Sequence, residues 1–318
     1  MISTDQLTAL LQADFGAWSR DDVERVTSGL GWRLDPDEAD GPMRVTARPR
    51  PEWDDRGWFG EYTSLTVHRG TPEAASATEH AGAHRAALAD VAAVLGPPAL
   101  VGGPDAWARW RLPKTVVTLE GSLSRRRGRS TLRLEVAPRD ATENDESWNA
   151  KWNEDWEPWY SWRATAPSGT PASRTLDGMM SWQRRNAAGW DELGSNLGSL
   201  FASLACDLSV LREYAWDVTW VIEPADGRDA YVQGYFGRRE ADRVAVVQTR
   251  EEWRRAPDSP GTEILNPTGP DGLRVAELAL AEIRSWELSG PDGLCYQAWS
   301  DDGYRLDDFG AGLTWSGR

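Results

Sequence analysis

The chain has 318 residues, 40% of them hydrophobic and 27% charged, and it carries a formal net charge of −15. A chain of this length can bury a large apolar core, and we expect it to form two domains. The acidic balance argues against a general nucleic-acid-binding protein, because such proteins gather Lys and Arg on one surface.

The first part of the chain predicts two short helices followed by strands. The first helix has three leucines on one face, and Ser19 is placed to cap the second, with Asp22 at the position of a capping box. Three segments bounded by polar loops then predict strands, at residues 31–35, 43–49 and 61–69.

A longer helix and a second group of strands follow. Thr71 and Pro72 form a typical helix start, and Gly96 with Pro97 forms a stop, so this helix is expected to end at Leu95. Three further strands are predicted at residues 106–112, 114–121 and 131–138.

The second half begins with an amphipathic helix. Its apolar residues recur every three or four positions, at Leu197, Leu200, Phe201, Leu204, Leu208 and Leu211. Alternating apolar and polar residues predict three strands that form a meander, at residues 215–223, 230–236 and 243–249. A helix near residues 273–288 and a strand at residues 294–299 complete the pattern.

This order of elements predicts an α+β fold. Each half contains a helix, a three-strand antiparallel meander, a helix and then one or more strands, which is the pattern expected of two similar units and of a duplication. Residues 165–178 are rich in Ser, Thr, Pro and Gly and lack periodicity, so we interpret them as a linker. The expected domains are residues 1–164, ending in a Trp-rich arm, and residues 179–318.

Tryptophan is concentrated in one short segment. The chain has 19 tryptophans, and residues 146–162 contain Trp148, Trp152, Trp156, Trp159 and Trp162. Because Pro158 breaks a helix, we expect a helix ending near Trp156 and then an extended segment. The candidate partner-binding residues are the six aromatic side chains Trp148, Trp152, Trp156, Trp159, Tyr160 and Trp162.

Two main interpretations of this segment are open. In the favoured one, Trp148, Trp152 and Trp156 pack against the protein's own sheet, while acidic residues such as Glu143 and Glu146 face water, because three buried indoles contribute on the order of 10 kcal/mol. The later aromatic residues then continue along the sheet. In the other, the tryptophans anchor a partner protein. Stacking on sugars is a further alternative, since the segment also supplies Asp, Asn and Glu.

Histidine and cysteine are too sparse to predict a metal centre or a catalytic nucleophile. His80 and His84 lie one helical turn apart, a spacing that can hold a metal, but Ala81 stands where a zinc protease has Glu. We therefore expect His84 at the edge of the core and no bound metal. Cys206 has no histidine near it in sequence and is interpreted as a structural thiol, with a disulfide to Cys295 left open.

Catalytic motifs are also missing from the sequence. It contains no phosphate-binding loop, no serine elbow and no paired-cysteine metal site, so we expect no enzyme activity and no cofactor. Acidic residues are too abundant for any one pair to indicate a glycosidase. The basic run Arg125–Arg129 is expected at a solvated hairpin tip. Because no secretory leader pattern or membrane-length apolar run is present, we expect a cytoplasmic protein with no membrane partner.

Three motifs in the first half of the chain support a resemblance to a protein family. They are WSRDDVERVTSGLGWRL (residues 18–34), ADVAAVLGPP (residues 89–98) and WRLPKTVVTLEG (residues 110–121). In their order they resemble an uncharacterised actinobacterial family of small α+β proteins. The resemblance covers residues 1–140 and implies an α+β fold without an assigned activity.

The second half resembles the secretion-chaperone-like domains, of the type III secretion chaperone kind, that are common in actinobacteria. The motifs concerned are LGSLFASLACDL (residues 197–208), WVIEPADGRDAYVQGYF (residues 220–236) and RVAVVQT (residues 243–249). This resemblance implies binding of a peptide or protein partner and no catalytic residues.

Taken together, the sequence predicts a cytoplasmic, non-catalytic protein that binds a protein or peptide, as a chaperone-like protein or as the immunity partner of a toxin. A basic partner is expected, because complementary charge speeds association. The alternative from another functional class is a carbohydrate-binding or carbohydrate-active protein that uses the Trp-rich segment.

Overall fold

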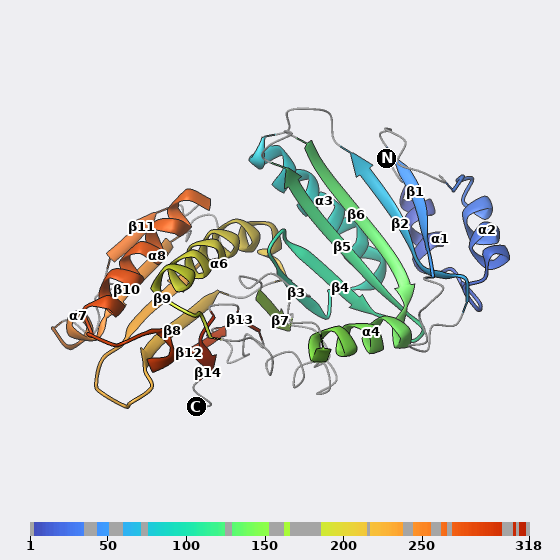
Figure 1. The fold of residues 1–318 in the computed structure, drawn as a ribbon. Helices are drawn as coiled ribbons and strands as arrows, with labels where there is room; N and C mark the ends of the chain where they lie inside the picture. Colours follow the sequence, from blue (N-terminus) through green and yellow to red (C-terminus); the bar gives the residue numbers. More distant parts are fainter. Residues whose placement is uncertain are drawn as a thin grey trace. The chain divides into compact units, whose positions relative to one another are not determined.

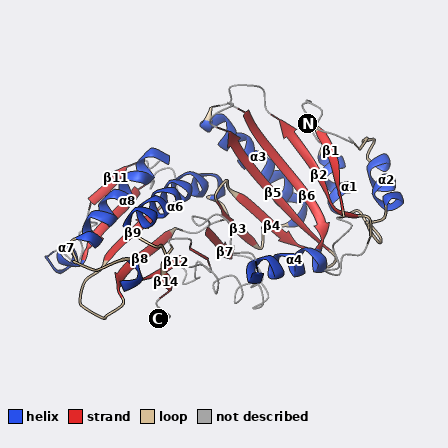
Figure 2. Cartoon of the chain, viewed as in Figure 1, coloured by secondary structure: helices blue, strands red, loops and turns tan. Residues whose placement is uncertain are grey.

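The chain divides into two compact units in the computed structural model. Unit 1 comprises Met1–Leu100 and Trp107–Asn149, and unit 2 comprises Val101–Ala106 and Ala150–Arg318. The residues described are 3–34, 43–50, 60–70, 76–124, 129–152, 162–165, 186–214, 217–237, 244–255, 262–265, 269–300, 308–309 and 312–315. Helices and largely antiparallel sheets make up both units (Figure 1, Figure 2), so the predicted α+β class is confirmed.

The described helices of unit 1 are α1 (Thr4–Leu11), α2 (Arg20–Gly29), α3 (Ala77–Leu95) and most of α4 (Arg139–Trp152). The first three begin at serine caps. Ser3, Ser19 and Ser76 each accept a hydrogen bond from the backbone N–H three residues later. At α3 the Glu79 side chain accepts a bond from the Ser76 backbone in return, which completes a capping box. The expected start at Thr71 lies outside the described residues.

Five strands of unit 1 form an antiparallel sheet in the order β1-β2-β6-β5-β4. They are β1 (Arg44–Pro49), β2 (Tyr62–Gly70), β4 (Trp107–Arg111), β5 (Thr115–Ser124) and β6 (Arg129–Pro138). The helix α3 lies against one face of this sheet (Figure 1). Trp110 points to that face, because its indole N–H donates to the Gly96 carbonyl at the end of α3 (2.8 Å). Side chains alternate along a strand, so Arg109 and Arg111 lie on the opposite face.

Unit 2 contains a six-stranded sheet in the order β11-β10-β9-β8-β12-β14. Its strands are β8 (Val218–Pro224), β9 (Val232–Phe236), β10 (Val244–Thr249), β11 (Thr262–Leu265), β12 (Leu294–Ser300) and β14 (Thr314–Trp315). Its described helices are α6 (Trp190–Leu211), α7 (Arg250–Arg255) and α8 (Gly269–Arg284), with the 3-10 turn η2 (Pro291–Gly293) before β12. Strands β8, β9 and β10 form the predicted meander.

The remaining strands of unit 2 are neighbours in the order β3 (Leu100–Gly103), β7 (Trp162–Thr165) and β13 (Asp308–Phe309). Only the first residue of β3 belongs to unit 1. The apolar core of unit 2 lies where α6 meets its larger sheet. Phe201 stacks on Trp220 with ring centroids 4.6 Å apart, and a Cβ atom at Gly234 would overlap the Trp220 indole. All six apolar residues of the predicted α6 stripe are buried.

Three sequence expectations differ from the structure. The predicted strand at 31–35 is not formed in residues 31–34, because Gly31 and Trp32 donate their N–H groups to Ser28 and Thr27 and so close the end of α2. Within the described residues, unit 1 has two strands, β1 and β2, between α2 and α3, where unit 2 has its three-strand meander. Strand β3 was not expected. Finally, β7 belongs to unit 2 rather than to the first 164 residues, because it pairs with β13.

The predicted linker lies almost wholly outside the described residues, since only Thr165, the last residue of β7, is described. Of the predicted basic hairpin tip, Arg129 begins β6 and the three preceding arginines lie outside the described residues. Within the ranges that are described, no helix combines the length and the apolar character needed to cross a membrane.

Candidate functional site

The helix α4 is held on the sheet of unit 1 by its acidic residues. Nη1 of Arg109 lies 2.6 Å from Glu146, and Arg111 donates two hydrogen bonds to Glu143, at 2.6 and 2.8 Å. The Glu146 and Glu143 side chains keep only 12% and 16% of their surface exposed. Such paired Arg–carboxylate contacts fix orientation as well as position. The expectation that the acidic side of this helix faces water is therefore wrong for these two residues.

The opposite side of α4 faces outward. Asp140, Asn144 and Trp148 are spaced four residues apart and are all exposed, and we call these three residues the α4 stripe. The Trp148 side chain keeps 52% of its surface exposed. Because the rise per residue in a helix is about 1.5 Å, the stripe spans roughly 12 Å. The expectation that Trp148 packs mainly against the sheet is therefore wrong.

The other five aromatic candidates have different placements. Trp152 is the last residue of α4, and its side chain is not among the parts described. Trp156, Trp159 and Tyr160 lie outside the described residues. Trp162 is in the extended strand β7 and is 1% exposed, so it belongs to the core of unit 2. Trp148 and Trp162 thus lie in different units, with opposite exposure.

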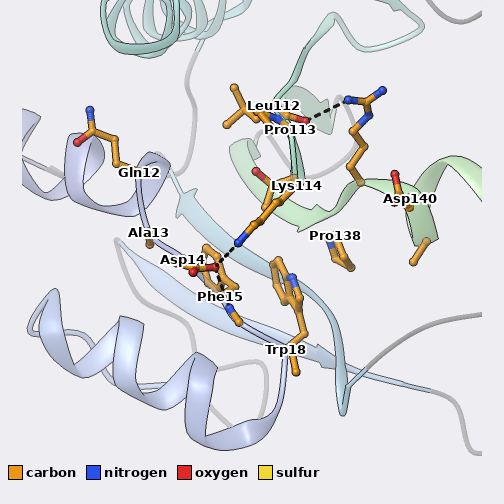
Figure 3. Close-up of a pocket in the computed structure, with 15 residues that line it drawn as sticks. Gln12, Ala13, Asp14, Phe15, Trp18, Leu112, Pro113, Lys114, Pro138 and Asp140 are labelled. Carbon is orange, nitrogen blue, oxygen red and sulfur yellow. Dashed lines mark hydrogen bonds and ion pairs between the residues drawn. The ribbon is translucent and has the colours of Figure 1, made fainter.

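A cavity of about 580 Å³ opens in unit 1 beside the start of α4. Its walls are residues 12–18, residues 112–115 and residues 138–141. Figure 3 shows Lys114 reaching from the second of these segments toward Asp14 in the first, with Trp18 beside it. Because Asp140 also lines this cavity, the α4 stripe begins at its rim.

Aromatic rings and backbone contacts give the cavity a fixed wall. Phe15 and Trp18 stack with centroids 4.4 Å apart and an angle of 9° between their planes, and both are buried. The Trp18 backbone has a φ of 59°, an uncommon value for a non-glycine residue, and its carbonyl accepts hydrogen bonds from Glu61 and Tyr62. These contacts hold the segment 12–18 against β2.

The rim of the cavity carries charges that are open to solvent. Lys114 Nζ lies 3.5 Å from Asp14, and both side chains are mostly exposed. The Gly16 N–H hydrogen bond and the Lys114 charge lower the pKa of Asp14 below its ordinary value. In contrast, Arg139 is engaged, since it donates to the Leu112 carbonyl (3.4 Å) and contacts Glu143. An exposed pair such as Asp14 and Lys114 can separate at little cost to admit another charged group.

The two histidines of α3 form a buried pair inside unit 1. Their rings lie 6.0 Å apart, and the His80 Nδ1 atom hydrogen bonds with Ser130. His84 is fully buried, deeper than the core edge expected for it, and neither of its ring nitrogens has a hydrogen-bond partner in the described part of the chain. Burial, together with His80, lowers the pKa of His84 to about 3. His84 is thus neutral at physiological pH.

A metal site is not formed by the groups that are described. Among these residues, no three His, Cys, Asp or Glu side chains gather closely enough to hold a metal ion. The two cysteines also remain apart: Cys206 is half-buried on α6, Cys295 is buried on β12, and they do not form a disulfide.

Sequence reasoning missed one buried acid, Asp207 on α6. An aspartate on an amphipathic helix is expected on its polar side, but Asp207 is only 6% exposed. Its position did contain a signal, because residue 207 follows Leu200 by seven residues, or about two helical turns, and so lies on the same face. Asp207 accepts hydrogen bonds from the Ala106 backbone, Ser203 and Trp162.

Comparisons with known proteins identified no relative of this chain. Neither the protein-family models, nor the curated proteins, nor the solved structures gave a match to the chain. The resemblances expected from the sequence therefore stay predictions, and the functional argument rests on the described residues.

Proposed function

We propose that this protein is a non-catalytic binding protein that receives a basic protein or peptide on unit 1, along the α4 stripe and the adjoining cavity. The observation that carries the proposal is the exposure of Trp148. The ion pairs of Glu143 and Glu146 turn α4 so that these two carboxylates contact the sheet and Trp148 contacts solvent. That orientation leaves about half of a large apolar side chain in water, where burial by a partner is favourable.

The chemistry of the α4 stripe fits a cationic residue. An Arg or Lys over an exposed indole face gains a cation–π interaction of about 0.5–1 kcal/mol, and more when water is excluded. Asp140 supplies a carboxylate at the rim of the cavity, and its residue lies about 12 Å from Trp148 along the helix axis. A partner segment with two basic residues can therefore contact both ends of the stripe.

The cavity provides room for an anchoring side chain. Its volume of about 580 Å³ lies within the usual range of ligand pockets, and Phe15, Trp18, Pro113 and Pro138 contribute apolar walls. The exposed pair of Asp14 and Lys114 at the rim can exchange its contact for one with the partner. A basic partner also gains from the net charge of −15, which increases the rate of encounter.

Within this proposal, the protein acts in the cytoplasm as a secretion-type chaperone or as the immunity partner of a basic toxin. Both roles need the same binding chemistry and no catalytic group. The second candidate function is carbohydrate binding. It is favoured by one observation, which is that Trp148 shares the exposed stripe with Asn144, one helical turn away, and with Asp140 at the far end, so that a ring for stacking and polar groups lie on one surface.

A peptide-display selection tests the proposal and separates the two candidates. Random peptides are selected on the intact protein alone, and the affinity of each recovered peptide for the parent and for Trp148→Ala is measured by calorimetry. The expected result is a set of Arg- and Lys-rich peptides that bind Trp148→Ala at least about tenfold more weakly, a difference of about 1.4 kcal/mol.

The matched control is Leu273→Ala, which removes another exposed large apolar side chain, on α8 of unit 2. This variant is expected to bind like the parent. Peptides that bind all three proteins equally, or that show no basic bias, contradict the proposal. Binding of glycans on an array, lost in Trp148→Ala, supports the carbohydrate alternative instead.

A further inference from the structure

The buried Asp207 joins three separate segments of unit 2. Its Oδ1 atom accepts a hydrogen bond from the Ala106 N–H at 3.0 Å. Its Oδ2 atom accepts from the Ser203 hydroxyl at 2.5 Å and from the Trp162 indole N–H at 3.3 Å. One carboxyl on α6 therefore contacts the turn that follows β3 and the buried tryptophan of β7.

This contact is closely packed. A Cβ atom at Gly103 would overlap both Oδ2 of Asp207 and the indole nitrogen of Trp162, so β3 lies directly against the carboxyl. Glycine is needed there because no side chain fits. We propose that Asp207 is a pH-responsive latch. By this we mean that its hydrogen bonds hold residues 104–106 and β7 against α6, and that ionisation of its carboxyl loosens this attachment.

The charged groups around Asp207 do not neutralise the negative charge of its ionised carboxyl. Within the described residues, no Lys, Arg or His forms an ion pair with it. From the turn after β3, Asp105 adds a second negative charge. On β7, Arg163 follows Trp162 and so projects to the other face of the strand. On α6 itself, Cys206 is adjacent and Arg212 lies more than one turn further along.

Two opposing influences act on the carboxyl. Burial and the charge of Asp105 raise the pKa of Asp207 to about 7, while the donors Ser203, Ala106 and Trp162 act to lower it. Burial prevails, because the three donors are neutral and cannot replace the solvation of a buried charge.

The neutral acid can keep the network intact. In that form one carboxyl oxygen still accepts from Ala106, and the acid O–H donates to the Ser203 oxygen, because a hydroxyl can rotate from donor to acceptor. The anion instead leaves a buried charge without a counter-ion, which favours entry of water and separation of the segments.

The sign of the pH effect follows from these states. The pKa of Asp207 is higher in the closed latch, at about 7, than its ordinary value of 3.8. Between these two values the closed form binds the proton more tightly than the open form, so closure is most stable at low pH. The latch therefore weakens as pH rises through 7 and stays weak above that.

Nuclear magnetic resonance of the intact protein tests the latch. The Trp162 indole N–H signal is assigned by its loss in Trp162→Phe, and its shift and hydrogen-exchange rate are followed from about pH 5 to pH 9. The expected result is one transition with a midpoint near 7, accompanied by exchange at least about tenfold faster than base catalysis alone accounts for.

Three variants make the assignment specific. Asp207→Asn is expected to abolish the transition. Asp105→Asn is expected to move the midpoint to lower pH, because it removes a negative charge that raises the pKa of Asp207. Asn also tolerates the left-handed backbone of residue 105, whose φ is 59°. Asp226→Asn, which removes an exposed carboxyl of the same unit, is expected to leave it in place.

A Trp162 signal that does not change over this range overturns the proposal, as does a transition that persists in Asp207→Asn. If Asp207→Asn does not fold, the parent and Asp105→Asn decide the matter, and an unmoved midpoint in Asp105→Asn then contradicts the proposal.

Discussion

The Glu146 carboxylate lies 2.6 Å from the Arg109 guanidinium, and this contact directs the acidic side of α4 to the sheet and Trp148 to solvent. Arg109 also lies over the Trp107 ring, with its guanidinium carbon 5.8 Å from the ring centroid. A strand residue that contacts both a helix carboxylate and a neighbouring indole thus determines which side of α4 is available for binding.

Removal of this ion pair is expected to destabilise unit 1. Glu146→Gln leaves a largely buried guanidinium without its charged partner, so the free energy of unfolding should fall by about 2 kcal/mol. Chemical denaturation measures the change. The control is Glu277→Gln, which breaks an exposed ion pair with Arg274 and should cost less than about 0.5 kcal/mol. Equal effects of the two substitutions contradict this account of α4.

The two described tryptophans of the Trp-rich segment are expected to respond oppositely to truncation. Trp162→Ala removes a core side chain and should lower the free energy of unfolding by about 3–5 kcal/mol. Trp148→Ala removes an exposed one and should change it by less than about 1 kcal/mol. Thermal melts of both variants check this contrast. A Trp148→Ala variant that is as unstable as Trp162→Ala would show that Trp148 belongs to the core.

The buried His84 is expected to make unit 1 sensitive to acid. Its pKa is about 3 in the folded protein and 6.5 ordinarily, so below pH 6.5 the unfolded chain binds the additional proton. Stability contributed by neutral His84 is therefore complete above pH 6.5 and is lost as pH falls toward 3. Hydrogen exchange of the α3 amides at several pH values measures it, and His84→Leu should flatten the dependence. A parent protein with constant α3 protection down to about pH 4 does not fit this expectation.

Gly121 is expected to be indispensable because it contacts that histidine. A Cβ atom at Gly121 would overlap the His84 ring, so Gly121→Ala should cost about 1–3 kcal/mol through overpacking. Gly29→Ala is the matched control, since no atom lies within 4 Å of its added Cβ and alanine is the better helix former. Denaturant midpoints compare the two, and a tolerated Gly121→Ala would mean that the ring of His84 can move aside.

The sequence predicted the elements with strong periodicity and missed the effects of tertiary contact. The buried stripe of α6 and the β8–β10 meander were predictable from the spacing of their apolar residues. Residues spaced three or four apart share one face of a helix, and alternate residues share one face of a strand. The orientation of α4 does not follow, because both its tryptophans and its glutamates recur at helical spacing. Two arginines on β4 decide between these faces, and contacts between residues 32 and 37 positions apart in sequence cannot be inferred from the helix alone.

Buried polar groups were missed for a related reason. Asp207 lies on the apolar face of α6, yet its residue type predicts exposure, and only Ala106 and Trp162 from other segments provide the donors that make its burial acceptable. The strand β3 escaped prediction because its four residues are too few for alternation to be recognised. The loss of a strand at residues 31–34 has a local cause, since the turn that closes α2 uses those backbone groups.

The exposure of Trp148 to a basic partner is tested most directly by fluorine resonance of protein labelled with 5-fluorotryptophan. The Trp148 and Trp162 signals are assigned by their loss in Trp148→Phe and Trp162→Phe, and the intact protein is titrated with the selected Arg-rich peptide. The account predicts that the Trp148 signal shifts and saturates with the peptide while the Trp162 signal stays in place. A Trp148 signal that does not move at saturating peptide would contradict it.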